Sequence, residues 1–358
     1  MKRVFSLVAT LLIIFSFFLM AIASNSTDNT NSSTEKATTS SPSTEDTDTL
    51  QPSSSKDDSA VDSIDPIVGE KTSFKDLGVG EVGRNDGVYI GLQYVKSMNY
   101  LPTALDKEEI SGENEVILGF FELYNGTKDV QNVRPEQITC YADGTQVDGV
   151  DTYITVKADG VSKLYSANLD PGCQLLTVQD FEVQKGWSEL KFYYDSVCIW
   201  TVSPNDVNED DYKLSSLFDV DNSKQTTELN ESIFQGDYDI QFQGVEVHKP
   251  KNQFIEDNYA VFKFHVTNNK EAAMDTSLMG YSMRAYQNNY YLGDASFVVD
   301  EKIDGYSNIF NVDSIEAGMS SDIYVAFALI EDTGTLYMVY DDGYITNHIC
   351  GYVYTSIS

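Results

Sequence analysis

Histidine is the side chain most often used for acid–base catalysis near neutral pH, and this chain has three, His248, His265 and His348. None of them belongs to a His-Glu-x-x-His arrangement of the kind that binds zinc. His265 alternates with apolar neighbours, so it lies on the polar side of a predicted strand. We expect it to be a solvated histidine rather than a catalytic base.

Two short segments begin like reactive loops and depart from them at the decisive positions. Residues 280–284, GYSMR, have the Gly and Ser of a nucleophile elbow but place Arg284 where the second Gly belongs. Residues 206–210, DVNED, begin like a calcium loop, yet Asp211 and Leu217 occupy the positions that need a turn-forming Gly and a bidentate acid. We therefore expect no catalytic residue, no cofactor and no metal site. We expect residues 206–210 to belong to a solvated acidic linker, and a weak cation site there is the alternative.

Tyrosine is abundant, with 23 residues, and it can pack a sheet face or contact a sugar or a protein partner. One predicted hairpin carries Arg284, Tyr286, Tyr290 and Tyr291 close together. Aromatic residues beside an arginine are common in binding hot spots. The candidate binding surface is this group, with Tyr141 at the matching place upstream. The alternative is that the same sheet face packs against another domain of the chain.

Strand alternation indicates which side each of these residues occupies. Phe262, Phe264 and Val266 alternate with polar residues and are predicted to point inward. If Ala285 also points inward, its neighbours Arg284 and Tyr286 must point outward. The Asn-Asn pair at 288–289 is a plausible hairpin turn, because Asn tolerates left-handed backbone.

The same plan occurs twice, which predicts an internal duplication. Landmarks keep their order and nearly their spacing: 139–144 matches 284–289, 169–172 matches 315–318, and 190–195 matches 336–341. By this match Cys140 is equivalent to Ala285 and Tyr141 to Tyr286. The alternative is that any two β-domains share such turns and tyrosine-rich strands.

Short apolar runs separated by Gly, Asn or Asp turns predict an all-β fold of two tandem immunoglobulin-like β-sandwiches. The predicted strands are 88–95, 116–123, 137–142, 175–183, 190–194 and 198–202, then 238–247, 260–266, 282–287, 323–329, 336–340 and 349–354. We call residues 74–203 the first module and 229–358 the second module. Each has an ordinary single-domain size, and we expect them to fold independently. The join, 204–228, is predicted to be an acidic linker with a turn of helix at 211–218.

The N-terminus predicts export. Residues 1–23 combine Lys2 and Arg3 with a long apolar run and an Ala-Ile-Ala cleavage site, as in a signal peptide. The run is long enough that an uncleaved membrane anchor is the alternative. Residues 24–73 are rich in Ser, Thr and Asp and poor in large apolar residues, so we expect a disordered tether.

The formal net charge is −33, from 56 acidic and 23 basic residues. Such a surface argues against nucleic acid and anionic lipid as partners and permits basic proteins. Exported cysteines can form disulfides; the four here are Cys140, Cys173, Cys198 and Cys350, and the sequence leaves their pairing open.

The chain resembles bacterial extracellular immunoglobulin-like domains of unknown function. The resemblance lies in residues 113–127, ENEVILGFFELYNGT, in the 169–172 turn with the strand after it, and in 264–269 and 283–289 of the second module. It implies a Gram-positive surface or secreted protein, often a lipoprotein, and it brings no catalytic residues. This chain has no Cys after the apolar run to take a lipid.

Together these features predict a non-catalytic binding or scaffolding protein, extracellular or on the cell surface, with a protein or glycan of the envelope as its partner. Membrane contact would come only through an uncleaved N-terminal segment. The alternatives are a carbohydrate-binding protein that uses surface tyrosines and a hydrolase with an unrecognised site.

Overall fold

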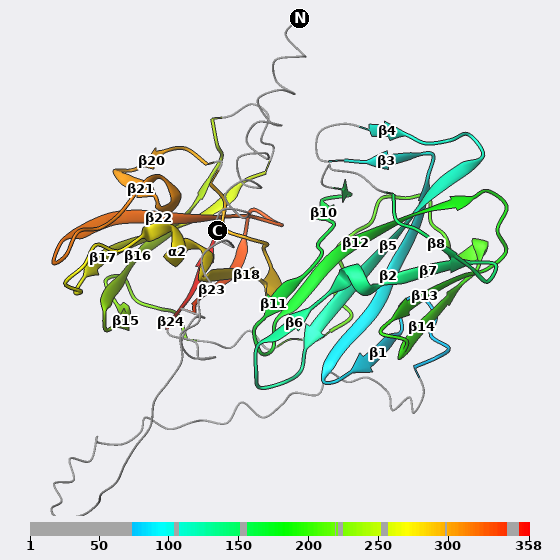
Figure 1. Cartoon of the computed structure of the whole chain (residues 1–358), viewed down its shortest axis with the longest axis horizontal. Helices are drawn as coiled ribbons and strands as arrows, with labels where there is room; N and C mark the ends of the chain where they lie inside the picture. Colours follow the sequence, from blue (N-terminus) through cyan, green and yellow to red (C-terminus); the bar gives the residue numbers. More distant parts are fainter. Residues whose placement is uncertain are drawn as a thin grey trace, which may run out of the picture. The chain divides into compact units, whose positions relative to one another are not determined.

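The structure, a computed structural model, confirms the all-β class (Figure 1). It describes residues 74–103, 107–150, 156–218, 220, 225–251, 257–297, 299–341 and 351–358. The predicted signal and tether, residues 1–73, lie outside the described residues, as do His348 and Cys350.

The first module contains two four-stranded sheets. The first sheet is β1 (Val82–Asn85), β2 (Val88–Met98), β5 (Asn114–Asn125) and β12 (Gln174–Gln184), in that order. The second sheet is β14 (Cys198–Val202), β13 (Leu190–Tyr194), β7 (Thr139–Ala142) and β8 (Thr145–Val147). Phe121 of the first sheet packs edge-on against Phe192 and Trp200 of the second. The core of the module therefore lies between the sheets, as in a β-sandwich.

The second module repeats this arrangement. Its first sheet is β15 (Ser232–Gln235), β16 (Tyr238–His248), β17 (Tyr259–Asn268) and β22 (Ser320–Ala328), extended by β21 (Tyr306–Asn308) and β20 (Lys302–Ile303). Its other strands are β24 (Gly351–Ile357), β23 (Gly334–Tyr340), β18 (Met283–Gln287) and β19 (Tyr290–Tyr291), in that order. Phe262, Phe264 and Val266 are fully buried in the core between them, as alternation predicted.

All twelve strands predicted from the sequence are present. Six are longer than predicted, two have the predicted bounds, two are shorter, and β22 and β24 are shifted along the chain. The remaining elements are short: β3 (Tyr100–Pro102), β4 (Lys107–Glu109), β6 (Gln131–Val133), β9 (Lys157–Ala158), β10 (Val161–Ser162), β11 (Ala167–Leu169), η1 (Pro135–Gln137), η2 (Pro204–Asp206), α2 (Thr276–Tyr281) and η3 (Ile309–Asn311). The sequence did not predict α2, which Asp275 caps by accepting from the Ser277 N–H. None of the helices in the described ranges is long and apolar enough to cross a membrane.

Hydrogen bonds around two asparagines show how closely the modules match. The Asn125 side-chain amide donates to the Asp129 and Leu169 carbonyls at 2.8 and 2.9 Å. The Asn268 amide donates to Ala272 and Ile315, both at 2.8 Å. Each asparagine therefore ties the end of a central strand to the turn that starts the next one.

The turns and bulges match as well. Gly172 and Gly318 have φ of 73° and 70°, and their N–H groups donate to the backbone carbonyls of Asn125 and Asn268, both at 2.9 Å. A residue at that φ is best a glycine. β2 and β16 each carry a register shift against the next strand. Such shared detail is what an internal duplication leaves behind.

The hairpin predicted at 288–289 is present, with Asn288 and Asn289 at φ of 50° and 66°. Its equivalent in the first module is the turn at Asp143 and Gly144, with φ of 47° and 81°. Positive φ at both central residues is the geometry of a tight β-hairpin turn.

The linker differs from the prediction. Residues 211–218 form no helix. Instead Tyr212 stacks on Phe120 with ring centroids 4.6 Å apart, and Phe218 stacks on Tyr124 at 5.3 Å. Both linker aromatics are buried because each packs against an aromatic side chain of β5. Apolar burial at these two positions outweighs the local helical preference of the segment.

Candidate functional site

The predicted binding residues of the second module, Arg284, Tyr286, Tyr290 and Tyr291, lie where the two modules meet. One eight-stranded sheet runs through both, in the order β1-β2-β5-β12-β19-β18-β23-β24. The connection is a single parallel pair, Gln174 with Tyr290, in which the Gln174 N–H donates to the Asn289 carbonyl at 2.9 Å. The edge of the first module is thus joined to the edge of the second.

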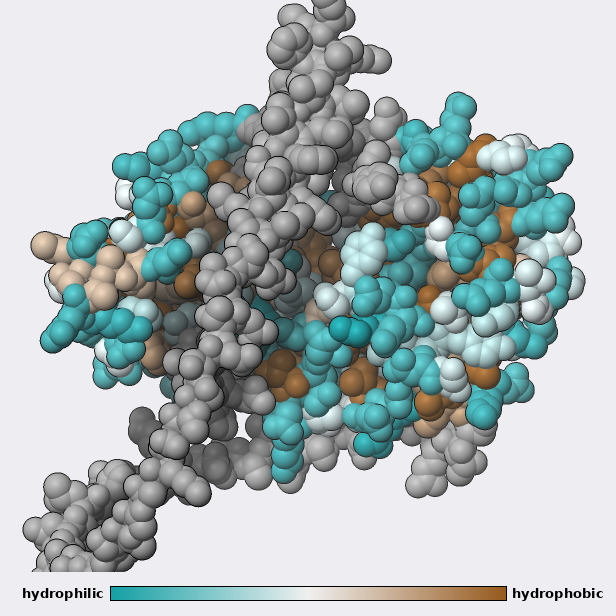
Figure 2. All heavy atoms as spheres, viewed as in Figure 1, coloured by the Kyte–Doolittle hydropathy of each residue, from teal (hydrophilic) through white to brown (hydrophobic). Residues whose placement is uncertain are grey.

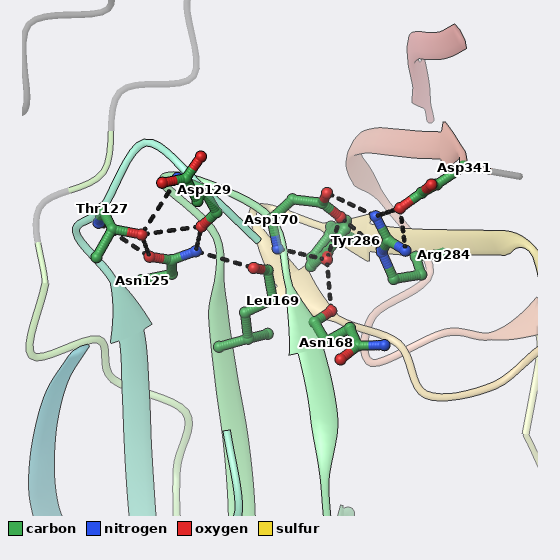
Figure 3. A network of polar contacts seen from close by, with 9 residues as sticks. All are labelled: Asn125, Thr127, Asp129, Asn168, Leu169, Asp170, Arg284, Tyr286 and Asp341. Carbon is green, nitrogen blue, oxygen red and sulfur yellow. Dashed lines mark hydrogen bonds and ion pairs between the residues drawn. The ribbon is translucent and has the colours of Figure 1, made fainter. Parts of the chain in front are cut away.

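Arg284 is the centre of the polar network at this junction (Figure 3). Its guanidinium donates to both carboxylate oxygens of Asp170, at 2.8 and 2.9 Å, and to Asp341 at 3.1 Å. The Asp170 side chain is 1% exposed and that of Arg284 12%. Burial alone would lower the pKa of the guanidinium, but the hydrogen bonds and charge of Asp170 outweigh it and leave the pKa raised. Arg284 is therefore charged, with two acidic partners.

Tyr286 completes this network. Its hydroxyl donates to the Asp170 carboxylate at 2.6 Å and accepts from the Asp170 N–H at 3.0 Å. Burial, with the nearby charge of Asp170, raises the pKa of Tyr286 well above its ordinary value. The tyrosine is therefore a neutral donor that fixes the Asp170 carboxylate for Arg284.

A second polar centre is Glu122 on β5, which is fully buried. It accepts from Tyr290 at 2.7 Å, from the Leu217 N–H at 2.7 Å and from the Ser216 hydroxyl at 2.8 Å, and it is also bonded by Gln93. The donors come from the second module, the linker and the first module. Burial raises the pKa of Glu122, although these hydrogen bonds act in the opposite direction.

Apolar contacts surround the polar ones. The hydrophobic cluster of the first module includes Tyr286, Tyr337, Val339 and Tyr354 of the second. Tyr286 stacks on Tyr337, with centroids 5.9 Å apart. Independent folding of the modules stays a prediction. Both modules contribute side chains to this hydrophobic cluster.

The structure corrects the exposure of the predicted site. Arg284 and Tyr286 do point away from the core of their own module, and Ala285 and Cys140 point inward, as alternation indicated. Yet Tyr286 is 0% exposed and Tyr290 5%, because the first module covers that face. The expected outward surface is thus an internal junction, the alternative that the sequence left open.

Of the other two predicted residues, Tyr291 packs against the same cluster at the junction and Tyr141 does not. Tyr291 is half-buried beside Tyr286 and donates to Asp294 at 3.0 Å. Tyr141 is half-exposed on β7, which belongs to the four-stranded sheet and not to the eight-stranded sheet that joins the modules. Its ring packs edge-on against Tyr193, with ring centroids 5.0 Å apart. The structure does not bring Tyr141 together with the group around Arg284.

The sequence missed Asp170 and Glu122, which hold the junction. Asp170 belongs to a turn that was used only as a landmark of the repeat. Its signal was present in the repeat itself, since both modules carry an acid there, Asp170 and Glu316. Glu122 stands among apolar residues of a central strand, a position where a carboxylate needs hydrogen-bonding partners.

The other groups that could do chemistry have local structural roles. His248 bonds Asp300 at 3.0 Å and His265 bonds Asp322 at 2.7 Å. Ser282 donates back to the Leu278 carbonyl at the end of α2. Within the described ranges, no group of three His, Cys, Asp or Glu residues could hold a metal ion.

Acids of the linker that resembled a calcium loop are used within the protein. The Asp206 carboxylate accepts from the Ser203 N–H at 2.8 Å, which starts η2. Asp211 pairs with Lys96 at 2.8 Å. Cys140, Cys173 and Cys198 are buried, and no disulfide joins any two of these three.

Comparison with known proteins finds one family model that matches part of the chain. A family model described as a domain of unknown function (DUF5067) matches residues 214–341. This agrees with the resemblance to domains of unknown function, although the matched range begins inside the predicted linker. No curated protein matches.

Three solved structures are similar over part of the chain. Two are named "putative lipoprotein". The one from Bacillus subtilis is 18% identical, with a TM-score of 0.28, over 35% of this chain and 39% of that one. The one from Staphylococcus aureus is 16% identical, with a TM-score of 0.28, over 35% and 91%. The third, an uncharacterized β-sandwich protein from Clostridium difficile, is 14% identical, with a TM-score of 0.24, over 38% and 97%. This chain thus spans well under half of the first.

The junction predicts unequal effects for two equivalent acids. Replacing Asp170 by Ala should lower the free energy of unfolding by about 3–5 kcal/mol, because it leaves the buried Arg284 without its main partner. Replacing the exposed Glu316, its counterpart in the second module, should change that free energy by less than about 0.5 kcal/mol. Urea denaturation of both variants measures the difference. Equal effects would show that the ion pair does not stabilise the fold.

The raised pKa of Glu122 predicts a pH-dependent gain for Glu122→Gln. A carboxyl whose pKa is higher in the folded state favours folding when protonated, so its contribution to stability falls as pH rises from about 4 through that raised pKa. The neutral amide avoids this loss, and the Tyr290 and Ser216 hydroxyls can reorient to accept from it. The melting temperature of the variant minus that of wild type should therefore rise from pH 4 to pH 7. The matched variant of the exposed Glu136 should show no such trend, and a falling difference for Glu122→Gln would contradict the assignment.

Proposed function

We propose that the chain is an exported protein of the Gram-positive cell envelope that binds or scaffolds other envelope components without catalysis. In this proposal it consists of two tandem immunoglobulin-like modules held on an N-terminal tether. The export part rests on the sequence of residues 1–73, and the module part rests on the repeated strand pairings.

One observation carries the proposal: two of the buried carboxylates of the described chain, Asp170 and Glu122, are used to hold the modules together. Arg284, Asp170 and Tyr286 bond one another, and Glu122 bonds both the linker and the second module. Such groups are costly to bury and are saturated here by partners within the chain. A fixed junction holds the loops of both modules in one arrangement, which suits a scaffold.

The surface supports a macromolecular partner. The face in Figure 2 is largely hydrophilic with scattered apolar residues, as expected for a strongly acidic chain. Large apolar side chains that are more than half exposed include Tyr281, Phe297 and Tyr352. They lie on different elements, and single exposed rings in an acidic surround fit contact with a basic protein.

A carbohydrate ligand is the second candidate, and a specific observation favours it. Tyr141 and Tyr193 form a half-exposed ring pair on one sheet face, 5.0 Å apart. Aromatic faces of this kind can stack on sugar rings.

Capture from envelope extract by the immobilised exported chain, with a glycan array in parallel, tests the proposal. We expect a retained protein or glycan whose binding survives Tyr286→Phe, since that residue is internal. Loss of glycan binding in Tyr141→Ser, with binding intact in Tyr352→Ser, would select the carbohydrate candidate. Turnover of a substrate by the purified chain would contradict a non-catalytic role.

A further inference from the structure

The junction between the modules is a contact between a turn and a sheet face. The turn belongs to the first module and supplies Asp170 and, just after it, Gln174 at the start of β12. The face belongs to the second module and supplies Tyr286 on β18 and the hairpin carbonyl of Asn289. Beside the Arg284–Asp170 ion pair, two hydrogen bonds make the contact, Tyr286 to Asp170 at 2.6 Å and the Gln174 N–H to Asn289 at 2.9 Å.

Every one of these four residues has a counterpart in the other module. On the sheet, Cys140 pairs with Phe192 as Ala285 pairs with Met338, which places Tyr141 where Tyr286 lies. The hairpin turn then puts Gly144 in the place of Asn289. The two turns correspond because Gly172 and Gly318 make equivalent hydrogen bonds. This correspondence places an acid, Glu316, at the position of Asp170, and Ser320 at the position of Gln174.

These counterparts are uncovered. Gly144, Glu316 and Ser320 are exposed, and Tyr141 is half-exposed. The Tyr141 hydroxyl donates to the exposed Gln146 side chain at 3.3 Å, a bond that it exchanges on docking. Met319 is 62% exposed, whereas Cys173, which precedes Gln174 in the same way, is fully buried at the junction. The edge of β22 is paired by β21 only at Ile323 and Tyr324, so that pairing does not reach Ser320.

We propose that the chain associates head to tail, with the 315–320 turn of one copy docking on the Tyr141 face of the next. Tyr141 donates to the Glu316 carboxylate of the other copy, and the Ser320 N–H donates to the Gly144 carbonyl. The occupant is a second copy of this chain, because the chain already makes this same contact between its own two modules. The ends of such a pair stay free, so the contact propagates into open chains rather than closing into a ring of two.

The basic residue of the proposed contact between copies lies at a different position from Arg284 of the junction. Thr139 stands where Arg284 lies, so the guanidinium has no direct equivalent. Lys191 instead takes the place of Tyr337, whose pKa is raised first by burial and also by the nearby charge of Asp170. An ammonium at that place lies close to the incoming Glu316. It is held on the surface now by Glu189, at 2.7 Å.

Charge sets the conditions for association. Two copies of a chain with a net charge of −33 repel each other, and salt screens that repulsion. Association should therefore strengthen as ionic strength rises from about 0.05 to about 0.5 M, unlike a contact dominated by opposite charges.

Site-directed cross-linking of the exported chain tests the register. Gln174 and Tyr290 are opposed across the junction, so Ser320 of one copy should oppose Thr145 of the next. Opposed strand residues are close enough for a disulfide. Mixing a Thr145→Cys chain with a Ser320→Cys chain under oxidation should give a cross-linked dimer. Either variant alone, and wild type, set the background from the native thiols.

Sedimentation of the unmodified chain provides the second measurement. Glu316→Gln and Tyr141→Phe should each weaken association about tenfold, because each removes a charge-assisted hydrogen bond. Tyr165→Phe, at an exposed site outside the face, should leave association unchanged, and none of these changes should shift melting. A monomer at all salt concentrations, or equal cross-linking of Thr145→Cys with itself, would overturn the proposal. Envelope capture by a strictly monomeric chain would leave the proposed function standing.

Discussion

The arrangement of the two modules depends on one buried ion pair. Arg284 can be buried only because Asp170 takes two of its hydrogen bonds and Asp341 a third. Breaking a pair of this kind costs several kcal/mol, since the remaining charge stays out of water. Arg284 and Asp170 belong to different modules, so any packing of the modules that keeps either charge buried without the other carries this penalty. The geometry of the junction is therefore enforced by charge as well as by apolar contact.

The rest of the junction follows from this constraint. Tyr286 can be fully buried because its hydroxyl has the Asp170 carboxylate as an acceptor. Glu122 is likewise buried with hydrogen-bond donors from other parts of the chain, the Leu217 N–H of the linker and the Tyr290 hydroxyl of the second module. The linker aromatics Tyr212 and Phe218 then cover the outer side of β5. A segment that is acidic in composition thereby becomes part of the packed structure.

The strands and the repeat could be predicted because they depend on local patterns. Alternation placed Phe262, Phe264 and Ala285 inward, and the Asn288-Asn289 pair marked its hairpin. What alternation cannot say is whether an outward face meets water or another domain. Tyr286 was placed on the correct side of its strand and given the wrong exposure for that reason. Asp170 and Glu122 were missed because their partners in the second module, Arg284 and Tyr290, lie 114 and 168 residues away in the sequence.

The similarity of the two modules bears on the proposed function. A unit that uses one face and one turn to join its neighbour leaves the same face and turn free at the two ends of the pair. Polar groups at the junction are used by the structure itself, so in the proposed function recognition would fall to the uncovered surface around Tyr141 and to the loops of both modules.

Calorimetry of the exported chain tests the central claim, that the Arg284–Asp170 pair couples the unfolding of one described module to that of the other. The account predicts a single melting transition whose calorimetric and van't Hoff enthalpies agree, and its separation into two transitions in Arg284→Met. Two independent transitions in the wild-type chain, unchanged by that substitution, would contradict it.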